Sequence, residues 1–431
     1  MIKSSLSVNE MSNAFSRALN EPNLASPDDT AIVFYNLAFL DERIKNLQNQ
    51  FPLQTLHAIA VKANPLTNIL SKIKTTGVGA EVASLPELYL AEKAGFAPET
   101  IVFDSPCKTK YELEYALRSG VCINADSFGE LDRITEILKT INSESIIGLR
   151  INPQVGPGSI KSTSVAEGIS KFGIPLHENR EKIIEYYLKH DFLRSIHVHI
   201  GSQGCPVPLV INGIRKVLDL VNEVNTHLEN EPKSNRIDTF DIGGGLPVSY
   251  HPGQEPVTME HYLEMLKASC SELFDGQFRL ITEFGRYIFA NTGWVASKVE
   301  YVKREPGYNI IMTHVGADLF LRKAYNPGDW HHHITVVDKL GKLRTGTDTN
   351  KYIVAGPLCF GGDVIATDLE LPLVVDGDFI LIHDAGAYNL SMWSRYNSRQ
   401  MPKVIGYHTT NDTFEILKER ERKEDLLEFW S

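Results

Sequence analysis

The sequence predicts an α/β fold in which a TIM-like (β/α)8 barrel is joined to a C-terminal β-sandwich or β-barrel domain. Three observations lead to this prediction. Short apolar runs alternate with amphipathic stretches, eight such runs precede residue 290, and short strands with Gly, Pro and Asp turns then follow. The runs are continuously apolar, which is typical of parallel strands that are buried on both faces.

The eight barrel strands are predicted from these apolar runs, which helix-like segments separate. We place them near residues 55–62, 79–83, 100–104, 121–125, 145–151, 194–200, 237–242 and 278–283. Apolar residues at three- and four-residue spacing predict helices over 64–75, 85–94 and 259–273. Eight strands close a barrel of this kind, and we assign the barrel to residues 36–290.

The rest of the chain is expected to form one β domain from residues 1–35 and 291–431. Its short strands are predicted at 352–354, 378–382 and 403–407. The apolar run at 31–35 precedes the first barrel strand, and we expect it to join the sheet of this domain. A tail rich in Glu and Lys at 418–425 is interpreted as the solvated face of a helix.

Composition limits the classes of partner and the cellular compartment that we expect for this protein. A net charge of -11 without a long basic run argues against nucleic-acid and anionic-membrane partners, and leaves small molecules or another protein. Five cysteines, an odd number without metal-like pairs, do not suit a disulfide framework. The start, Met1-Ile2-Lys3-Ser4-Ser5, lacks the apolar core of a signal peptide, and no stretch is as long as a membrane span. We therefore expect a reduced, cytoplasmic protein.

Polar residues recur at the carboxyl ends of the predicted strands, where the active sites of such barrels lie. Lys62 ends the first strand. A desolvated lysine there is held partly neutral and can form a Schiff base with a carbonyl compound. The alternative is a lysine that extends from a strand end into solvent. The next strand ends favour the first interpretation, because they carry Glu81, Asp104, Asp126, Arg150, Asn152 and His199.

The last two strands end in residues that suit an anion and an aromatic nitrogen. Gly243, Gly244 and Gly245 follow the seventh strand, where backbone N–H groups can surround a phosphate. Glu283 follows the eighth strand and can keep a pyridine nitrogen protonated. Pyridoxal 5'-phosphate needs a lysine, a phosphate site, an acid and a flat partner for its ring, and the candidates are Lys62, the three glycines with Ser202, Glu283 and His199.

Two groups of histidines raise the question of a metal site. We expect His197 to face the surrounding helices and His199 to face the site, on the argument that strand residues alternate between faces. The triplet His331-His332-His333 follows a Pro-Gly-Asp turn and is interpreted as a surface or strand-entry feature. No metal site is predicted.

Seven motifs, in their order and spacing, resemble those of the fold type III pyridoxal phosphate decarboxylases, the family of diaminopimelate and ornithine decarboxylases. The motifs are Ala60-Val61-Lys62-Ala63-Asn64, Glu81-Val82-Ala83-Ser84, His199-Ile200-Gly201-Ser202-Gln203, Gly243-Gly244-Gly245, Glu283-Phe284-Gly285-Arg286, Gly356-Pro357-Leu358-Cys359 and Asp384-Ala385-Gly386-Ala387-Tyr388. The resemblance covers nearly the whole chain and is nearer to the diaminopimelate branch. It implies a β domain similar to that of alanine racemase.

The resemblance also implies roles for single residues. Lys62, His199 and Cys359 would be catalytic, with Cys359 donating a proton. The implied cofactor-binding residues are Lys62, Glu81, His199, Ser202, Gly243, Gly244, Gly245, Glu283, Gly285, Arg286 and Tyr388, and the implied substrate-binding residues are Arg286, Arg322, Tyr325, Phe360 and Tyr388.

In the family the cysteine comes from the β domain of a second subunit, so we expect a homodimer with shared active sites. Taken alone, a cysteine after Gly-Pro is more often a small buried hydrophobic residue. The nearby Asp363 either orients the loop of Cys359 or caps a turn.

Departures from the diaminopimelate pattern bear on the substrate. The family's Cys-Glu is Cys359-Phe360 here, and Phe360 removes the charge that binds the distal ammonium of a diamino substrate. The family's Arg-Pro motif, with a tyrosine four residues past the arginine, is one residue shorter, Arg322 to Tyr325. Its Glu-Pro-Gly-Arg becomes Glu283 to Arg286 with Phe284 for proline, which keeps both charges.

We therefore expect decarboxylation at the α-carboxylate of another amino acid, in specialised metabolism. Phe360 fits a free apolar or siderophore-precursor amino acid, and it also fits a glutamyl-type aminoacyl group tethered to an acyl carrier protein. A racemase similar to alanine racemase is disfavoured, because its ring nitrogen faces an arginine and its second base is a tyrosine, whereas this chain offers Glu283 and Cys359. A catalytically silent regulatory homologue would be expected to lose Lys62 or the glycines, and both are present.

Overall fold

The computed structural model describes residues 6–229, 236–255 and 257–431. Residues 1–5, on which the expectation about a signal peptide depends, lie outside the described residues. The chain divides into two compact units. One comprises Met1–Arg43, Ser249–Glu255 and Ile288–Ser431, and the other comprises Ile44–Val248 and Pro256–Tyr287.

The second unit is a closed barrel, as predicted. Within the described residues, each of its eight strands pairs in parallel with the next, and the last pairs with the first. These strands are β2 (Leu56–Ala60), β3 (Gly79–Val82), β4 (Ile101–Asp104), β5 (Cys122–Ala125), β6 (Ile147–Asn152), β8 (Leu193–Val198), β9 (Thr239–Asp241) and β10 (Arg279–Thr282). The two-residue strand β7 (Ile174–Pro175) adds only to the end of β6. All eight predicted barrel strands are therefore present.

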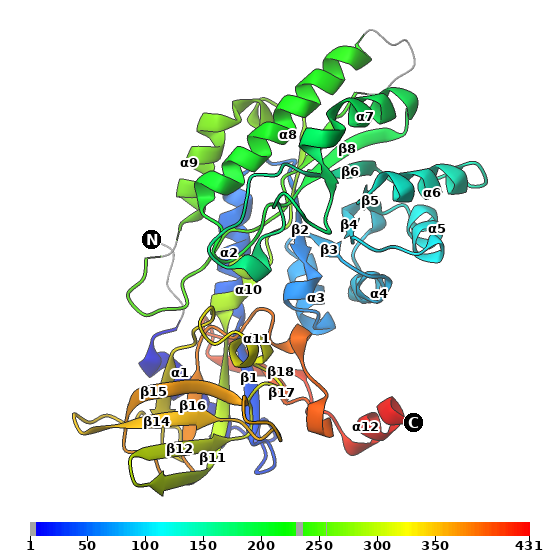
Figure 1. Ribbon diagram of the computed structural model, residues 1–431. Coiled ribbons are helices and arrows are strands. Elements are labelled where there is room, and N and C mark those ends of the chain that lie inside the picture. The colour runs from blue at the N-terminus through cyan, green and yellow to red at the C-terminus, as the bar shows by residue number, and fades with distance from the viewer. Residues whose placement is uncertain (1–5, 230–235, 256) are drawn as a thin grey trace. The chain divides into compact units, whose positions relative to one another are not determined.

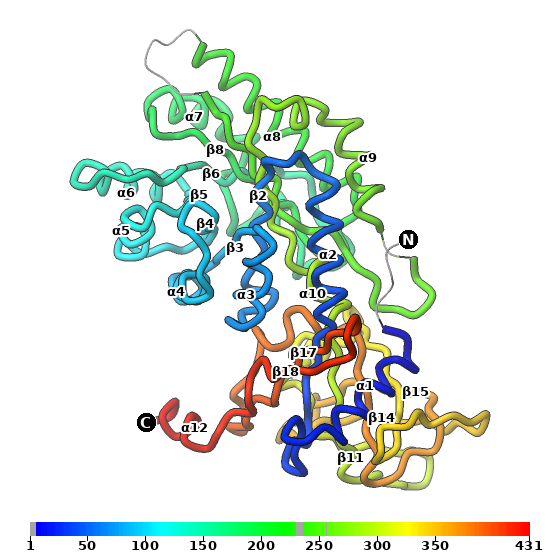
Figure 2. The backbone as a smooth tube through the Cα atoms, turned by 180° about the vertical axis from the view of Figure 1, so that it is seen from behind, coloured from blue at the N-terminus to red at the C-terminus, as the bar shows by residue number. Residues whose placement is uncertain are grey.

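Helices follow the strands along the outside of the barrel (Figure 1). They are α2 (Leu37–Gln50), α3 (Thr67–Lys74), α4 (Leu85–Ala94), α5 (Lys110–Ser119), α6 (Phe128–Leu138), α7 (Leu176–Lys189), α8 (Val207–Leu228), α9 (Met259–Ser269) and α10 (Arg286–Phe289). Figure 2 shows α3, α4, α5 and α6 in sequence along one flank.

Local sequence explains where these helices begin and end. Ser84 caps α4 by accepting a hydrogen bond from the N–H of Glu87, and Gly95 ends the helix at a φ of +90°, where glycine avoids a steric cost. Thr109 and Glu112 form a reciprocal capping box at the start of α5. These caps start α4 and α5 shortly after β3 and β4 end, which keeps the residues at those strand ends at one rim of the barrel.

The first unit is built on a mixed, curled sheet. Its main path runs β15, β14, β12, β11, β1, β17, β18, while β16 pairs with both β11 and β13. These strands are β1 (Ala31–Asn36), β11 (Gly293–Glu305), β12 (Tyr308–Thr313), β13 (Ile334–Val337), β14 (Thr349–Ala355), β15 (Val364–Pro372), β16 (Phe379–Ile382), β17 (Lys403–His408) and β18 (Thr413–Lys418), and the helices of this unit are α1 (Val8–Asn20), α11 (Leu321–Tyr325) and α12 (Lys423–Trp430). The N-terminal strand β1 lies between β11 and β17.

Aromatic packing forms the core of this unit. Phe34 of β1 and Trp294 of β11 stack with their ring centroids 5.0 Å apart, and Phe15 of α1 meets Phe34 edge to face. All three side chains are buried, so α1 covers one face of the sheet with its apolar side.

One predicted element is wrong in part. Residues 418–425 are not a single helix face, because Lys418 is the last residue of β18 and α12 begins only at Lys423. Within the described residues, no helix is both long and apolar enough to cross a membrane.

Candidate functional site

Lys62 lies in a single 3-10 turn, Val61–Ala63, directly after β2. Its Nζ atom is 2.7 Å from Oε1 and 2.6 Å from Oε2 of Glu81, the penultimate residue of the neighbouring strand β3. Glu81 is completely buried, and burial raises its pKa to about 8, against the lowering effect of Lys62. The lysine therefore faces a carboxylate that holds a proton more readily than an exposed one.

The three glycines form a narrow loop between β9 and the barrel rim. The N–H of Gly243 donates to Asp241, and the carbonyl of Gly243 accepts from the N–H of Glu283. Cβ atoms added to Gly244 and Gly245 would lie only 2.4 Å and 2.1 Å from the nearest carbonyl oxygens. Because no larger side chain fits, the backbone of this loop can approach an anion closely, although the N–H groups of Gly243 and Gly244 already donate to Asp241 and His199.

Arg286 and Ser202 meet beside this loop. Arg286 opens α10 after the turn at Gly285, is buried, and donates from Nε to the hydroxyl of Ser202 at 3.1 Å. Ser202 itself is held by its N–H, which donates to the carbonyl of Thr163. A cation, a hydroxyl and a glycine backbone are the groups that proteins use to bind phosphate.

Glu283 follows β10 and is 4% exposed. Its Oε2 atom is 3.4 Å from Nε2 of His197, while its Oε1 atom has no hydrogen-bond partner among the described residues. A buried carboxylate oxygen without a partner costs free energy unless a ligand supplies a donor. The protonated ring nitrogen of pyridoxal phosphate is such a donor, so Glu283 fits the predicted cofactor.

His199 follows β8, and its Nδ1 atom accepts a hydrogen bond from the N–H of Gly244. Burial, helped by the charge of Arg150, lowers its pKa to about 3, so the ring is neutral and can lie against a flat cofactor. The prediction that His197 faces the helices is wrong. His197 lies in β8 and His199 follows two residues later, so the two share a face, and His197 points into the barrel toward Asp104 and Glu283.

His197 belongs to a buried cluster of charged residues that sequence reasoning recognised only as separate strand ends. Arg150 of β6 donates from Nη1 to Asp104 of β4 at 2.9 Å. Burial would raise the pKa of Asp104, but Arg150 and His197 lower it well below its usual value. Asp104, His197 and Glu283 also have the spacing of a possible metal site. Inward-facing strand positions, counted in steps of two, are the signal that could have found this cluster.

The remaining candidate residues lie in the β unit. Cys359 is exposed in the loop between β14 and β15, where its N–H donates to Asn397 and its carbonyl accepts from the Tyr396 hydroxyl. Asp363 orients this loop, because its carboxylate accepts from the N–H of Leu358 at 2.6 Å and from the N–H of Ala317 at 2.6 Å. Asp363 therefore does more than cap a turn.

Phe360 belongs to a cluster of three aromatic rings that we call the aromatic trio: Tyr325, Phe360 and Tyr396. Tyr325 stacks on Phe360 with ring centroids 5.9 Å apart, and Tyr396 meets Phe360 edge to face at 5.9 Å. Tyr325 is 67% exposed and Tyr396 is 49% exposed. The trio is thus an open aromatic surface beside Cys359.

Arg322 contacts other residues of the β unit. Its guanidinium lies 3.9 Å from the ring centroid of Trp330 and 5.1 Å from that of Tyr388, and it donates to the carbonyl of Ala387. Tyr388 has a φ of +59°, a left-handed backbone conformation that is uncommon for a residue other than glycine. Contacts with two aromatic rings orient the guanidinium group.

The histidine triplet lies at the entry to β13, as predicted, but it is not wholly on the surface. His332 is buried, contacts the carbonyl of His383 through Nδ1, and packs edge to face against Phe320 and Tyr250.

The candidate residues form two groups. The barrel brings together Lys62, Glu81, His199, Ser202, Gly243, Gly244, Gly245, Glu283, Gly285 and Arg286 at the carboxyl ends of its strands, and the β unit carries Arg322, Tyr325, Cys359, Phe360 and Tyr388.

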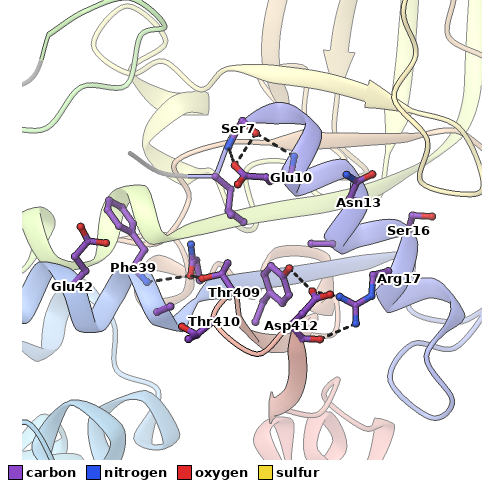
Figure 3. A pocket seen from close by; sticks show the side chains of 15 residues that line it. Ser7, Glu10, Asn13, Ser16, Arg17, Phe39, Glu42, Thr409, Thr410 and Asp412 are labelled. Atoms are coloured by element: carbon purple, nitrogen blue, oxygen red, sulfur yellow. Dashed lines mark hydrogen bonds and ion pairs between the residues drawn. The ribbon is translucent and has the colours of Figure 1, made fainter. Parts of the chain in front are cut away.

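A cavity of about 1140 Å³ in the β unit is a weaker candidate. It lies between α1, the start of α2 and the turn that joins β17 to β18 (Figure 3). Its polar side chains already bind one another: Glu10 caps Ser7, and Asp412 pairs with Arg17 and Tyr407. These contacts leave it without the open acceptor that marks the barrel site.

Comparisons with known proteins agree with the geometry of the barrel site. Residues 37–290 match the family model described as pyridoxal-dependent decarboxylase, pyridoxal binding domain. The diaminopimelate decarboxylase of Archaeoglobus fulgidus is 32% identical over 409 residues, which cover 93% of this chain and 92% of the relative. That of Aquifex aeolicus is 30% identical over 418 residues, which cover 96% and 94%.

A solved structure gives the same answer. Diaminopimelate decarboxylase from Helicobacter pylori, complexed with L-lysine, has a TM-score of 0.82 at 29% identity and covers 94% of this chain and 97% of that one. The chain therefore belongs to the fold type III pyridoxal-dependent decarboxylases, on the diaminopimelate decarboxylase-like branch, and is an amino-acid decarboxylase that uses pyridoxal 5'-phosphate.

Proposed function

We propose that the enzyme removes the α-carboxylate of an amino acid whose distal end differs from that of diaminopimelate. The observation that carries this proposal is Phe360. It stands where the family has the glutamate that binds the distal ammonium, and its neighbours Tyr325 and Tyr396 are aromatic rather than acidic. An aromatic surface favours an uncharged or apolar group over an amino-carboxylate end.

Bound pyridoxal phosphate supplies an aromatic ring that accepts the electrons released when the bond to the carboxylate breaks. The chain's part begins with Lys62, the residue we propose to hold the cofactor. A lysine must lose its proton before it can bond to a carbonyl carbon, and the carboxylate of Glu81, 2.6 Å away, is the acceptor within reach. The raised pKa of Glu81 supports this exchange.

The phosphate would be held by the backbone of Gly243 to Gly245, the hydroxyl of Ser202 and the guanidinium of Arg286. The bond between Arg286 and Ser202 supports this role, because it fixes a cation and a hydroxyl at one edge of the glycine loop. His199, neutral and bonded to Gly244, would lie against the ring.

Cys359 is the proposed proton donor to the α-carbon, and we propose that it acts in the site of a partner subunit, within a homodimer. Its exposure and the hydrogen bonds that hold its loop support this role, because a donor from another subunit must be both accessible and oriented. The five cysteines, all free thiols in the structure, support a reducing, cytoplasmic setting.

Arg322 bears on the choice of substrate. We propose that Arg322 contacts an oxygen of the substrate while its guanidinium stays against the rings of Trp330 and Tyr388. These rings then limit the size of the substrate group that can reach Arg322. A glutamyl-type group tethered to an acyl carrier protein is the second candidate, since its distal end is an uncharged thioester.

The experiment is a carbon dioxide release assay of the cofactor-loaded enzyme. The substrates are meso-diaminopimelate, lysine, ornithine, arginine, glutamate, citrulline, apolar amino acids and carrier-linked aminoacyl groups. We expect the fastest turnover with a substrate whose distal end is uncharged, and Phe360→Glu should raise the activity on diaminopimelate. Tyr301→Glu, at an exposed aromatic residue of β11, is the matched control and should change nothing. Fast decarboxylation of meso-diaminopimelate by the unmodified enzyme would refute the assignment.

A further inference from the structure

His197 occupies the centre of the buried charged cluster inside the barrel. Its Nδ1 atom is 3.5 Å from Oδ1 of Asp104, and its Nε2 atom is 3.4 Å from Oε2 of Glu283. The imidazole is completely buried, and neither carboxylate is more than 4% exposed. Each ring nitrogen therefore faces an acid from a different strand end.

We propose that His197 is a positioning residue, an imidazolium ion between Asp104 and Glu283 that keeps Glu283 ionised where it meets the ring nitrogen of the cofactor. This inference rests on the proposed role of Glu283. An imidazolium can donate from both nitrogens, whereas a neutral imidazole has one N–H and would turn a lone pair toward one of the carboxylates. Two buried carboxylates without a cation between them are costly.

Other charged and titratable groups surround His197. Burial opposes a charge on His197, but Asp104, Glu283 and Asp241 together raise its pKa to about 9. Burial and the charge of Glu283 raise the pKa of Asp241 well above its usual value. Arg150 supplies a second cation, 2.9 Å from Asp104. The carboxylate of Asp126 lies 3.8 Å from Nε of Arg150, and the charges of Lys62 and Lys108 also lower the pKa of Asp104.

The contact with His197 explains how Glu283 can serve the cofactor although it is buried. Burial would raise the pKa of Glu283, and His197 lowers it, so that the carboxylate stays an acceptor. One oxygen, Oε2, faces His197, and the other, Oε1, is the acceptor without a partner among the described residues. His197 thereby fixes which oxygen is presented to the ring.

A metal ion is the competing interpretation, because ligand atoms of the same three residues lie within 4.8 Å of one another. A metal would need a lone pair from a neutral His197. The proposal requires a proton on each nitrogen instead, so metal content and protonation state distinguish the two.

The test compares the wild-type holoenzyme with His197→Asn, Glu283→Gln and the double variant. His57→Asn is the matched control, because His57 is another buried barrel histidine, which bonds to the hydroxyl of Thr282, meets Phe51 edge to face and is kept neutral by burial, with a pKa of about 4. The readouts are the pH titration of the absorbance of the bound cofactor, kcat, KM, and the metal content of the purified protein.

We expect His197→Asn to displace the absorbance transition by about one pH unit or more and to lower kcat about tenfold or more, with little change in KM. The double variant should be no worse than Glu283→Gln, because both changes remove one interaction. His57→Asn should titrate like the wild type. A purely structural role of His197 would lower stability without moving the titration.

Three results would overturn the proposal: an unchanged titration and kcat in His197→Asn, effects that simply add to those of Glu283→Gln, or one equivalent of metal per chain. If His197→Asn does not fold, ¹⁵N-histidine NMR of the wild-type holoenzyme decides, since an imidazolium signal should persist at pH 8 and its absence would contradict us. A wild-type enzyme that takes up no cofactor on Lys62 would instead refute the proposed function.

Discussion

The glycine loop after β9 permits a sharp test, because the structure distinguishes two reasons why a position requires glycine: lack of space for a Cβ atom and a positive φ. Gly244 is needed for space alone: an added Cβ would lie 2.4 Å from the carbonyl oxygen of Glu283, and its φ is not positive. Gly245 is needed for both space and conformation, with a contact of 2.1 Å to the carbonyl oxygen of Gly201 and a φ of +107°. Gly276 is needed for conformation alone, because its φ is +92° and an added Cβ would meet nothing within 4 Å.

These geometries set the expected magnitudes. Gly276→Ala should lose about 1 to 2 kcal/mol of stability, the cost of a side chain in left-handed backbone, and leave the site intact. Gly244→Ala must move the backbone by about 1 Å to reach ordinary contact, either at Glu283 or within the loop. A displacement of that size at the phosphate should weaken cofactor affinity on the order of 100-fold.

The assay is an absorbance titration of each apoenzyme with pyridoxal phosphate, together with thermal unfolding. We expect Gly244→Ala and Gly245→Ala to lose affinity, and Gly276→Ala to lose only stability. Wild-type affinity in Gly244→Ala would refute the reasoning that the close approach of backbone in this loop forms the phosphate site. Equal loss of affinity in Gly276→Ala would show that general destabilisation is the cause.

Three further predictions concern buried charges. Asp363→Ala should leave two backbone N–H groups without acceptors, cost about 3 kcal/mol and lower turnover through the loop of Cys359. Glu370→Ala, at an exposed site of β15, the strand that follows Asp363, should stay within about 0.5 kcal/mol of wild type in urea melts. Lys108→Met should cost about 3 kcal/mol in the same assay, because it leaves the buried carboxylate of Glu130 without its partner, and a neutral result would contradict this. Because the pKa of His197 is raised, its contribution to stability should be complete below pH 6.5 and should be lost as the pH rises through about 9. Urea melts from pH 6 to 10 should show a loss of about 3 kcal/mol in the wild type that is missing in His197→Asn. A stability that increases with rising pH would refute this prediction.

Much of the barrel could be predicted, because each strand is a continuous apolar run that ends in a polar or glycine residue. Lys62, the glycines and Glu283 stand at such ends, and closure of the barrel brings them together. The same reasoning failed for His197 because we placed it on the opposite face from His199, whereas extended residues two apart share a face.

Other features depend on contacts that no local pattern encodes. The aromatic trio joins α11 with two loops far along the chain, so its stacking could not be predicted from the neighbours of Phe360. The stacking of Arg322 between Trp330 and Tyr388 is equally non-local. The strand β18 was missed because a six-residue segment with mixed exposure has no strong period.

The central claim is that Lys62, beside Glu81, holds the cofactor. Reduction of the purified holoenzyme with borohydride, followed by peptide mass mapping, tests this claim most directly, with Lys62→Ala as the variant that removes the amine. We predict a pyridoxyl group on Lys62 in the wild type, and neither that group nor turnover in the variant. A pyridoxyl group on a different lysine, or an active Lys62→Ala enzyme, would contradict the account.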